Sequence, residues 1–168
     1  MRIHLVYEKQ KTEIDFAIWI PEERGFNING EPRLIIGEAK SFGEDIIKGN
    51  DLDKLKKTAS VIPDSVIVIS VLKDSFSKEE KQRLIEFVSW AREPVNYRPR
   101  HWVILLTGTE LFNDSLERTW QNLGEPYSTH ANTHSTHYLE PISDATQSIY
   151  LGLDYYYTWL DNKPRKIN

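Results

Sequence analysis

The chain has 168 residues, enough for one domain with a substantial core, and its 39% hydrophobic and 27% charged residues are ordinary for a soluble globular protein. The absence of cysteine excludes disulfides and thiolate metal sites and fits the cytoplasm, and no segment has the character of a signal peptide or a membrane span. The net charge of −4 argues against indiscriminate nucleic-acid binding but permits a local basic groove.

The first forty residues predict three strands, because apolar and polar side chains alternate there. The strands are expected at residues 2–8, 13–20 and 33–40, with a polar loop rich in Gly, Asn and Pro before the third. Three strands that follow one another this closely are expected to form an antiparallel meander.

Helical and strand patterns then alternate through the rest of the chain. A helix is expected from an Asn50 or Asp51 cap, and a second from a Ser77 cap with Glu80 three residues on, the signature of a capping box. Continuous apolar runs at 65–72 and 101–107 predict buried strands. Two further helices are expected at 110–124 and 144–160, with a Ser/Thr/His loop at 125–140 between them.

The fold class that follows is α/β: a mixed β-sheet flanked by helices, with a C-terminal helical extension. We expect a single domain spanning 1–168, in which the core is about 1–107 and the extension about 108–168.

The apolar pattern of the third strand, "RLIIGEAK", is interrupted by a carboxylate and a lysine. Symmetric antiparallel pairing of 13–20 with 33–40 places Asp15 opposite Glu38 and Glu13 opposite Lys40, all on one face. Directly opposed Cβ atoms lie about 5 Å apart, so the two carboxylates repel each other unless a divalent cation binds between them. Ligands that are all oxygen favour a hard cation, Mg²⁺ or Mn²⁺.

The segments "EIDFAIWI" and "IIGEAKSF" resemble the PD-(D/E)XK nuclease superfamily, and the resemblance covers roughly residues 2–72. It implies a restriction-endonuclease-like fold whose core is a helix, three meandering strands, a helix and a fourth strand. It also implies that Asp15, Glu38 and the Ala39 carbonyl bind the metal and that Lys40 assists phosphodiester hydrolysis. Asp15, Glu38 and Lys40 are then the catalytic residues.

Two features depart from that superfamily. Ile14 stands where the motif has proline, and the superfamily's first helix, which often supplies another acidic residue, has no counterpart before residue 2. We expect the chain to be a fragment, or the helix to be replaced by a partner subunit, a second copy or the C-terminal helices. Glu8 is the candidate for the additional acidic ligand.

An E-x-K triplet alone carries little information, since about one is expected by chance in a chain of this length. Glu79 and Lys81 form a second one inside a predicted helix, without a paired Asp strand. The structural alternative for the first is an ordinary Glu13–Lys40 ion pair on a solvated face. Gly37 and Ala39 argue against it, because small residues on the other face suit helix packing in a sandwiched sheet.

Four basic residues are candidates for contact with a nucleic-acid backbone: Lys54, Lys57, Arg98 and Arg100. For the two lysines, simple exposure to solvent is as good an interpretation as contact with a nucleic acid. For the arginines and the adjacent His101, a solvated loop is the better one.

His130, His134 and His137 have a spacing compatible with zinc, but their Ser/Thr-rich surroundings favour a solvated loop. The aromatic cluster at 155–159 favours a core or oligomer contact over a base-stacking platform.

The leading hypothesis is a metal-dependent nuclease that hydrolyses phosphodiester bonds, in DNA rather than RNA. The alternative is a catalytically inactive binding or assembly domain with the nuclease fold.

Overall fold

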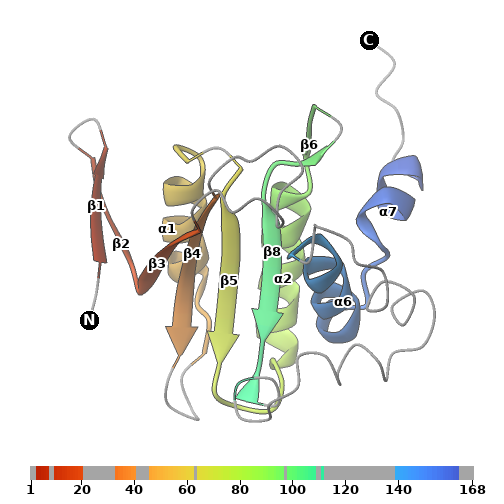
Figure 1. Cartoon of the computed structure of the whole chain (residues 1–168). Coiled ribbons are helices and arrows are strands. Elements are labelled where there is room, and N and C mark those ends of the chain that lie inside the picture. The colour runs from red at the N-terminus through yellow and green to blue at the C-terminus, as the bar shows by residue number, and fades with distance from the viewer. Residues whose placement is uncertain are drawn as a thin grey trace.

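The centre of the protein is a four-stranded mixed sheet with helices against it (Figure 1). The computed structural model describes residues 3–7, 10–20, 33–40, 46–62, 64–96, 98–108, 111 and 139–162. The strands of this sheet are, in spatial order, β3 (Phe16–Ile20), β4 (Arg33–Lys40), β5 (Val66–Val71) and β8 (Trp102–Leu106). Two strand pairs lie outside it: β1 (Ile3–Tyr7) with β2 (Gln10–Ile14), and β6 (Pro94–Val95) with β7 (Arg98–Pro99).

Strand directions divide the sheet into an antiparallel edge and a parallel remainder. β3 pairs antiparallel with β4 in the predicted register, with Phe16 opposite Gly37. β4, β5 and β8 are parallel, so Lys40 pairs with Val71 at the carboxyl ends of their strands. A parallel pair requires a crossover, which helix α1 (Gly49–Ala59) and helix α2 (Lys78–Ala91) supply.

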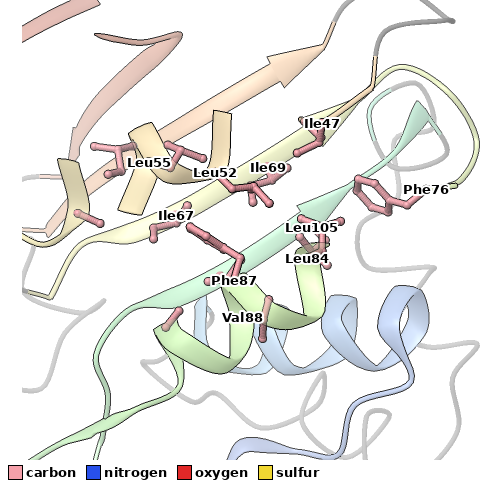
Figure 2. Close-up of a cluster of buried hydrophobic side chains, with 14 of the residues drawn as sticks. Ile47, Leu52, Leu55, Ile67, Ile69, Phe76, Leu84, Phe87, Val88 and Leu105 are labelled. Carbon is pink, nitrogen blue, oxygen red and sulfur yellow. The ribbon is translucent and has the colours of Figure 1, made fainter. Parts of the chain in front are cut away.

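The main core lies between the sheet and these two helices (Figure 2). Ser77 caps α2 as expected, and the helical spacing of Leu84, Phe87, Val88 and Ala91 turns one apolar stripe toward the strands. From the sheet, Ile36, Ile67, Ile69, Val103 and Leu105 meet the helices. Glu38 and Lys40 alternate with Ile36 along β4, so they lie on this same face.

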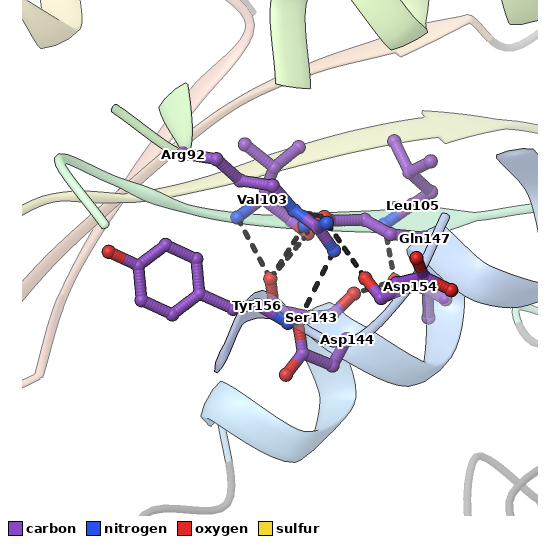
Figure 3. Close-up of polar contacts among 9 residues, drawn as sticks. Arg92, Val103, Leu105, Ser143, Asp144, Gln147, Asp154 and Tyr156 are labelled. Atoms are coloured by element: carbon purple, nitrogen blue, oxygen red, sulfur yellow. Dashed lines mark hydrogen bonds and ion pairs between the residues drawn. The ribbon is translucent and has the colours of Figure 1, made fainter. Parts of the chain in front are cut away.

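Helix α6 (Leu139–Leu151) covers the free edge of β8 and satisfies its backbone with side chains (Figure 3). The Val103 N–H donates to Ser143 Oγ at 3.2 Å, and the Leu105 N–H donates to Thr146 Oγ1 at 3.1 Å. The Val103 carbonyl accepts from Gln147 Nε2 at 2.7 Å. An exposed edge invites pairing with another chain, and the polar face of α6 prevents it here.

Arg92 connects this edge to the C-terminal helix α7 (Tyr156–Asn162) (Figure 3). Its guanidinium donates to Gln147 Oε1 at 2.7 Å and to the Asp154 carbonyl at 2.8 Å, and lies 3.4 Å from Asp144 Oδ1. Because Asp144 also accepts the Tyr156 N–H, one buried carboxylate serves both α6 and α7.

The single helix predicted at 144–160 is wrong, because the chain forms α6 and α7 instead. Gly152 separates them with a φ of +66°, a conformation that other residues adopt only with strain. Its N–H donates to the Ser148 carbonyl, which closes the end of α6. The helix predicted at 110–124 lies outside the described residues.

The three N-terminal strands pair in the predicted antiparallel order, but they do not form a single sheet. The predicted strand 13–20 breaks at Asp15, and its first part pairs with β1 rather than with β4. The β1–β2 hairpin therefore stands beside the four-stranded sheet, next to β3 (Figure 1).

The coarser prediction, an α/β fold with a mixed sheet flanked by helices, is confirmed. Among the described residues, every helix is too short or too polar to cross a membrane.

Candidate active site

Asp15 lies at the break between β2 and β3, and its side chain accepts a hydrogen bond that a backbone carbonyl would accept in a regular strand pair. Its N–H donates to the Gly37 carbonyl at 3.1 Å although Gly37 pairs with Phe16, so two successive residues are directed at one partner, as in a β-bulge. Asp15 Oδ2 then accepts the Ala39 N–H at 2.8 Å. This bond fixes the Asp15 carboxylate beside the E-x-K segment.

Gly37 is required here because the ring of Phe16 lies over it. A Cβ at this position would meet Phe16 Cζ at 2.1 Å and the Val68 carbonyl oxygen at 2.5 Å. The expectation that Gly37 and Ala39 make room for helix packing is therefore wrong, since the Phe16 ring fills the space over Gly37 and Ala39 is exposed.

Glu38 occupies an apolar row beneath the helices, next to Ile69 of β5. Its residue surface is only 8% exposed. Burial, the largest cause, and the nearby charges of Asp15 and Asp51 raise the pKa of Glu38, while Lys40 opposes the increase. Asp15, whose carboxylate accepts the N–H of the next residue Ala39, lies beside Glu38 in a site that is costly to keep charged.

Two carboxylates hold the Lys40 ammonium. Its Nζ lies 2.6 Å from Glu38 Oε1 and 3.1 Å from Asp51 Oδ2. Burial alone lowers the pKa of Lys40, but the hydrogen bonds to Glu38 and Asp51 outweigh it, and the pKa is raised. Lys40 therefore remains a cation, suited to stabilising negative charge rather than to accepting a proton.

Asp51 is the site residue that sequence reasoning missed. The sequence identifies it only as a candidate helix cap, but Lys48 occupies the cap position and the Asp51 carboxylate accepts the Lys48 N–H at 3.0 Å. The sequence contains a signal for this contact, an acidic residue in the first turn of the helix that follows the E-x-K strand. That helix begins at the carboxyl end of the sheet, where Lys40 lies.

The β3–β4 register does not extend to Glu13. The Cα partner of Glu13 is His4 in the β1–β2 hairpin, and Lys40 has Glu38 and Asp51 as its acidic partners. Glu8 lies outside the described residues. Ala39 is exposed between the two charged residues of the motif.

The second E-x-K lies inside helix α2, as its sequence context predicted. Glu79 is exposed and pairs with Arg83 one turn along α2. The intervening Glu80 is fully buried and accepts the N–H groups of Ile47 and Ser77 together with the Lys73 ammonium.

The basic candidates fall into two regions. Lys54 lies one turn beyond Asp51 on α1, and Lys57 is exposed one turn further. Arg98 and Arg100 precede β8, at the amino ends of the parallel strands, whereas Glu38 and Lys40 lie at the carboxyl ends. The structure therefore does not bring the arginines to the acidic site.

Arg98 and Arg100 instead line a separate cavity of about 780 Å³. Arg100 also lies over the Trp90 ring, 5.7 Å from its centroid. His101 is buried there, with Nδ1 3.0 Å from Ser65 Oγ, and burial lowers its pKa, so it is a neutral core histidine rather than a phosphate contact.

His130, His134 and His137 lie outside the described residues. In the aromatic cluster, Tyr156 is fully buried with its ring edge against Trp102, which confirms a core role for this residue.

Few side chains at this site could coordinate a cation. The described residues contain no cluster of three or more Asp, Glu, His or Cys arranged to hold a metal. Asp15 and Glu38 supply two carboxylates, and proteins commonly bind Mg²⁺ through one or two carboxylates together with water and substrate phosphate. Burial and the neighbouring charge of Asp15 raise the pKa of Glu38, and a bound cation would offset both, so the residues fit Mg²⁺ or Mn²⁺.

Comparisons of the chain with protein families, with curated proteins and with solved structures found no match.

Proposed function

We propose that the protein is a metal-dependent nuclease that hydrolyses phosphodiester bonds, in DNA rather than RNA, at the site formed by Asp15, Glu38 and Lys40. The observation that carries the proposal is the placement of Asp15 and Lys40 around the buried Glu38: Asp15 Oδ2 accepts the Ala39 N–H at 2.8 Å, and the Lys40 ammonium lies 2.6 Å from Glu38 Oε1. A buried carboxylate beside a second carboxylate is costly to a fold, and metal binding is a specific reason for keeping the arrangement.

Each side chain has a distinct task in this proposal. Asp15 and Glu38 would hold Mg²⁺ or Mn²⁺, with the Ala39 carbonyl next to them as a further oxygen donor. When bound, such a cation polarises a phosphoryl oxygen and acidifies water. The Lys40 ammonium would lie against the phosphate and offset the charge that develops on its oxygens.

Lys54 and Lys57 are the basic residues best placed to contact the nucleic-acid backbone, since α1 extends from the site. Arg98 and Arg100 would contact nucleic acid only if it also reached the amino ends of the strands.

The second candidate is a non-catalytic binding or assembly domain. The contact between Lys40 and Glu38 Oε1 favours it, because an internal cation already neutralises part of the acidic pair. The two candidates differ in whether an external cation has any effect on function.

The test is a plasmid-cleavage time course with Mg²⁺, with Mn²⁺ and with EDTA. We expect cation-dependent cleavage by the wild type and loss of cleavage in Glu38→Gln. Glu79→Gln is the matched control, because it alters the glutamate of the other E-x-K on an exposed helix surface. Cleavage that persists in EDTA, or an active Glu38→Gln, contradicts the proposal; absence of cleavage under every condition favours the binding domain.

A further inference from the structure

Lys40 bridges two elements of the fold through its ammonium. Glu38 lies two residues away on the same strand, whereas Asp51 reaches Lys40 from the first turn of α1. The Asp51 carboxylate is itself fixed, because Oδ2 also accepts the Lys48 N–H at 3.0 Å. The acceptor from α1 therefore has a defined position that does not depend on Glu38.

In the proposed function, the Lys40 ammonium and the divalent cation compete for the Glu38 carboxylate. Its Oε1 accepts a hydrogen bond from Lys40 at 2.6 Å, and the same carboxylate is proposed to bind a divalent cation. An ammonium and a divalent cation repel each other at such short range. Occupation of Glu38 by a cation therefore requires the Lys40 ammonium to have another acceptor.

We propose that Asp51 is a positioning residue that retains the Lys40 ammonium when Glu38 binds the divalent cation. The inference rests on the proposed function and deepens it: Asp51 lets a catalytic cation and a catalytic ammonium occupy one small site together. In this proposal Asp51 acts through Lys40 rather than as a metal ligand, because its Oδ2 is engaged by Lys40 and by the Lys48 N–H.

The structure offers a clean substitution for testing this role. Asp51→Asn removes the charge that holds Lys40, while the amide oxygen can still accept the Lys48 N–H and preserve the start of α1. Asp53→Asn is the matched control, because Asp53 is exposed on the same helix and its loss changes the net charge equally. If Asp51→Asn does not fold, Asp51→Ser replaces it, since a hydroxyl also accepts the cap bond.

The experiment is a double-mutant cycle in which calorimetry measures Mn²⁺ affinity for wild type, Asp51→Asn, Lys40→Met and the double variant. Without Asp51, the ammonium stays on Glu38 and competes with the cation. We expect Asp51→Asn to weaken Mn²⁺ binding about tenfold when Lys40 is present and less than about twofold in the Lys40→Met background. Asp53→Asn should leave the affinity unchanged.

Three outcomes separate the possibilities. An equal loss of affinity in both backgrounds shows that Asp51 acts on the cation directly, and unchanged affinity in Asp51→Asn shows that it does not assist at all; either result overturns the inference while leaving the metal site in place. A wild type that binds no Mn²⁺ overturns the proposed function itself, and the inference falls with it.

Discussion

Asp15 Oδ2 accepts the backbone N–H of Ala39 at 2.8 Å, so a catalytic candidate also replaces a bond of the strand ladder. The strand breaks at Asp15, and its carboxylate is thereby held next to Glu38 and Lys40. This dual role separates the charge of Asp15 from its capacity as a hydrogen-bond acceptor, and the two can be tested independently.

Replacing Asp15 by Asn should keep the hydrogen bond and remove the charge. Burial is the largest cause of the raised pKa of Glu38, and the charge of Asp15 is the next cause that raises it. Asp15→Asn therefore removes part of the electrostatic repulsion on Glu38. We expect the free energy of unfolding to stay unchanged or to rise by up to about 1 kcal/mol, while Mn²⁺ affinity falls. Denaturant unfolding and calorimetry measure the two quantities.

Asp15→Ala is the contrasting variant, because it removes the acceptor as well and should cost about 1–2 kcal/mol of stability. If Asp15→Asn is as destabilised as Asp15→Ala, the charge of Asp15 serves the fold rather than a cation.

Lys40→Ala should separate cleavage from metal binding. Loss of the ammonium leaves Glu38 and Asp51 without their shared cation, so the metal-free protein should lose about 1–3 kcal/mol of stability, and Mg²⁺ should restore part of it. Cleavage should fall about 10²–10³-fold, the usual effect of removing one charge-stabilising group. Lys40→Arg should rescue poorly, because the broader guanidinium does not fit the same two acceptors. Cleavage at the wild-type rate in Lys40→Ala would show that the lysine only neutralises its neighbours.

Glu80 should be the most sensitive carboxylate for stability. Burial alone raises its pKa, but hydrogen bonds from Lys73, Ser77 and Ile47 reverse the effect, and the pKa is lowered. Glu80→Gln leaves Lys73 without its partner and should cost about 3–5 kcal/mol, measured by denaturant unfolding at pH 7. The exposed Glu79→Gln should cost less than about 0.5 kcal/mol.

Glu80→Gln should also change how the stability of the protein responds to low pH. A carboxylate whose pKa is lowered by folding stabilises the native state above its unfolded pKa, and this contribution is lost as the pH falls through the folded value. Glu80→Gln should therefore lose less stability than the wild type on acidification below about pH 4. Equal acid sensitivity in the two proteins would contradict the assigned hydrogen bonds.

Asp144 should produce the opposite pH dependence. Burial raises its pKa to about 6 although Arg92 opposes the increase. The folded state then holds a proton that the unfolded chain releases near pH 4, so stability should fall by about 3 kcal/mol as the pH rises from about 4 to about 6. Asp144→Asn should remove this decline, which unfolding curves at several pH values measure.

Asp161→Asn is the control for Asp144, since Asp161 is exposed on α7 and should leave the wild-type pH profile intact. A decline that persists in Asp144→Asn would assign it to another group.

The acidic pair was predictable because its signal is local. Alternation in two short segments identified the strands, and their symmetric register placed Asp15 near Glu38; the observed pairing of Phe16 with Gly37 has that register. The Ser77 cap and the buried strands at 65–72 and 101–107 were likewise predicted from adjacent residues alone.

Contacts between distant segments were decided only by the tertiary structure. Asp51 looked like an ordinary helix cap, and its contact with Lys40 depends on where α1 returns to the sheet. Ser143, Thr146 and Gln147 are polar, so no apolar pattern marked the face with which α6 covers β8. Side-chain periodicity indicates which residues become buried. The partner of each buried charge and of each backbone group outside the strand ladder is set by the packing of elements that are far apart in the chain.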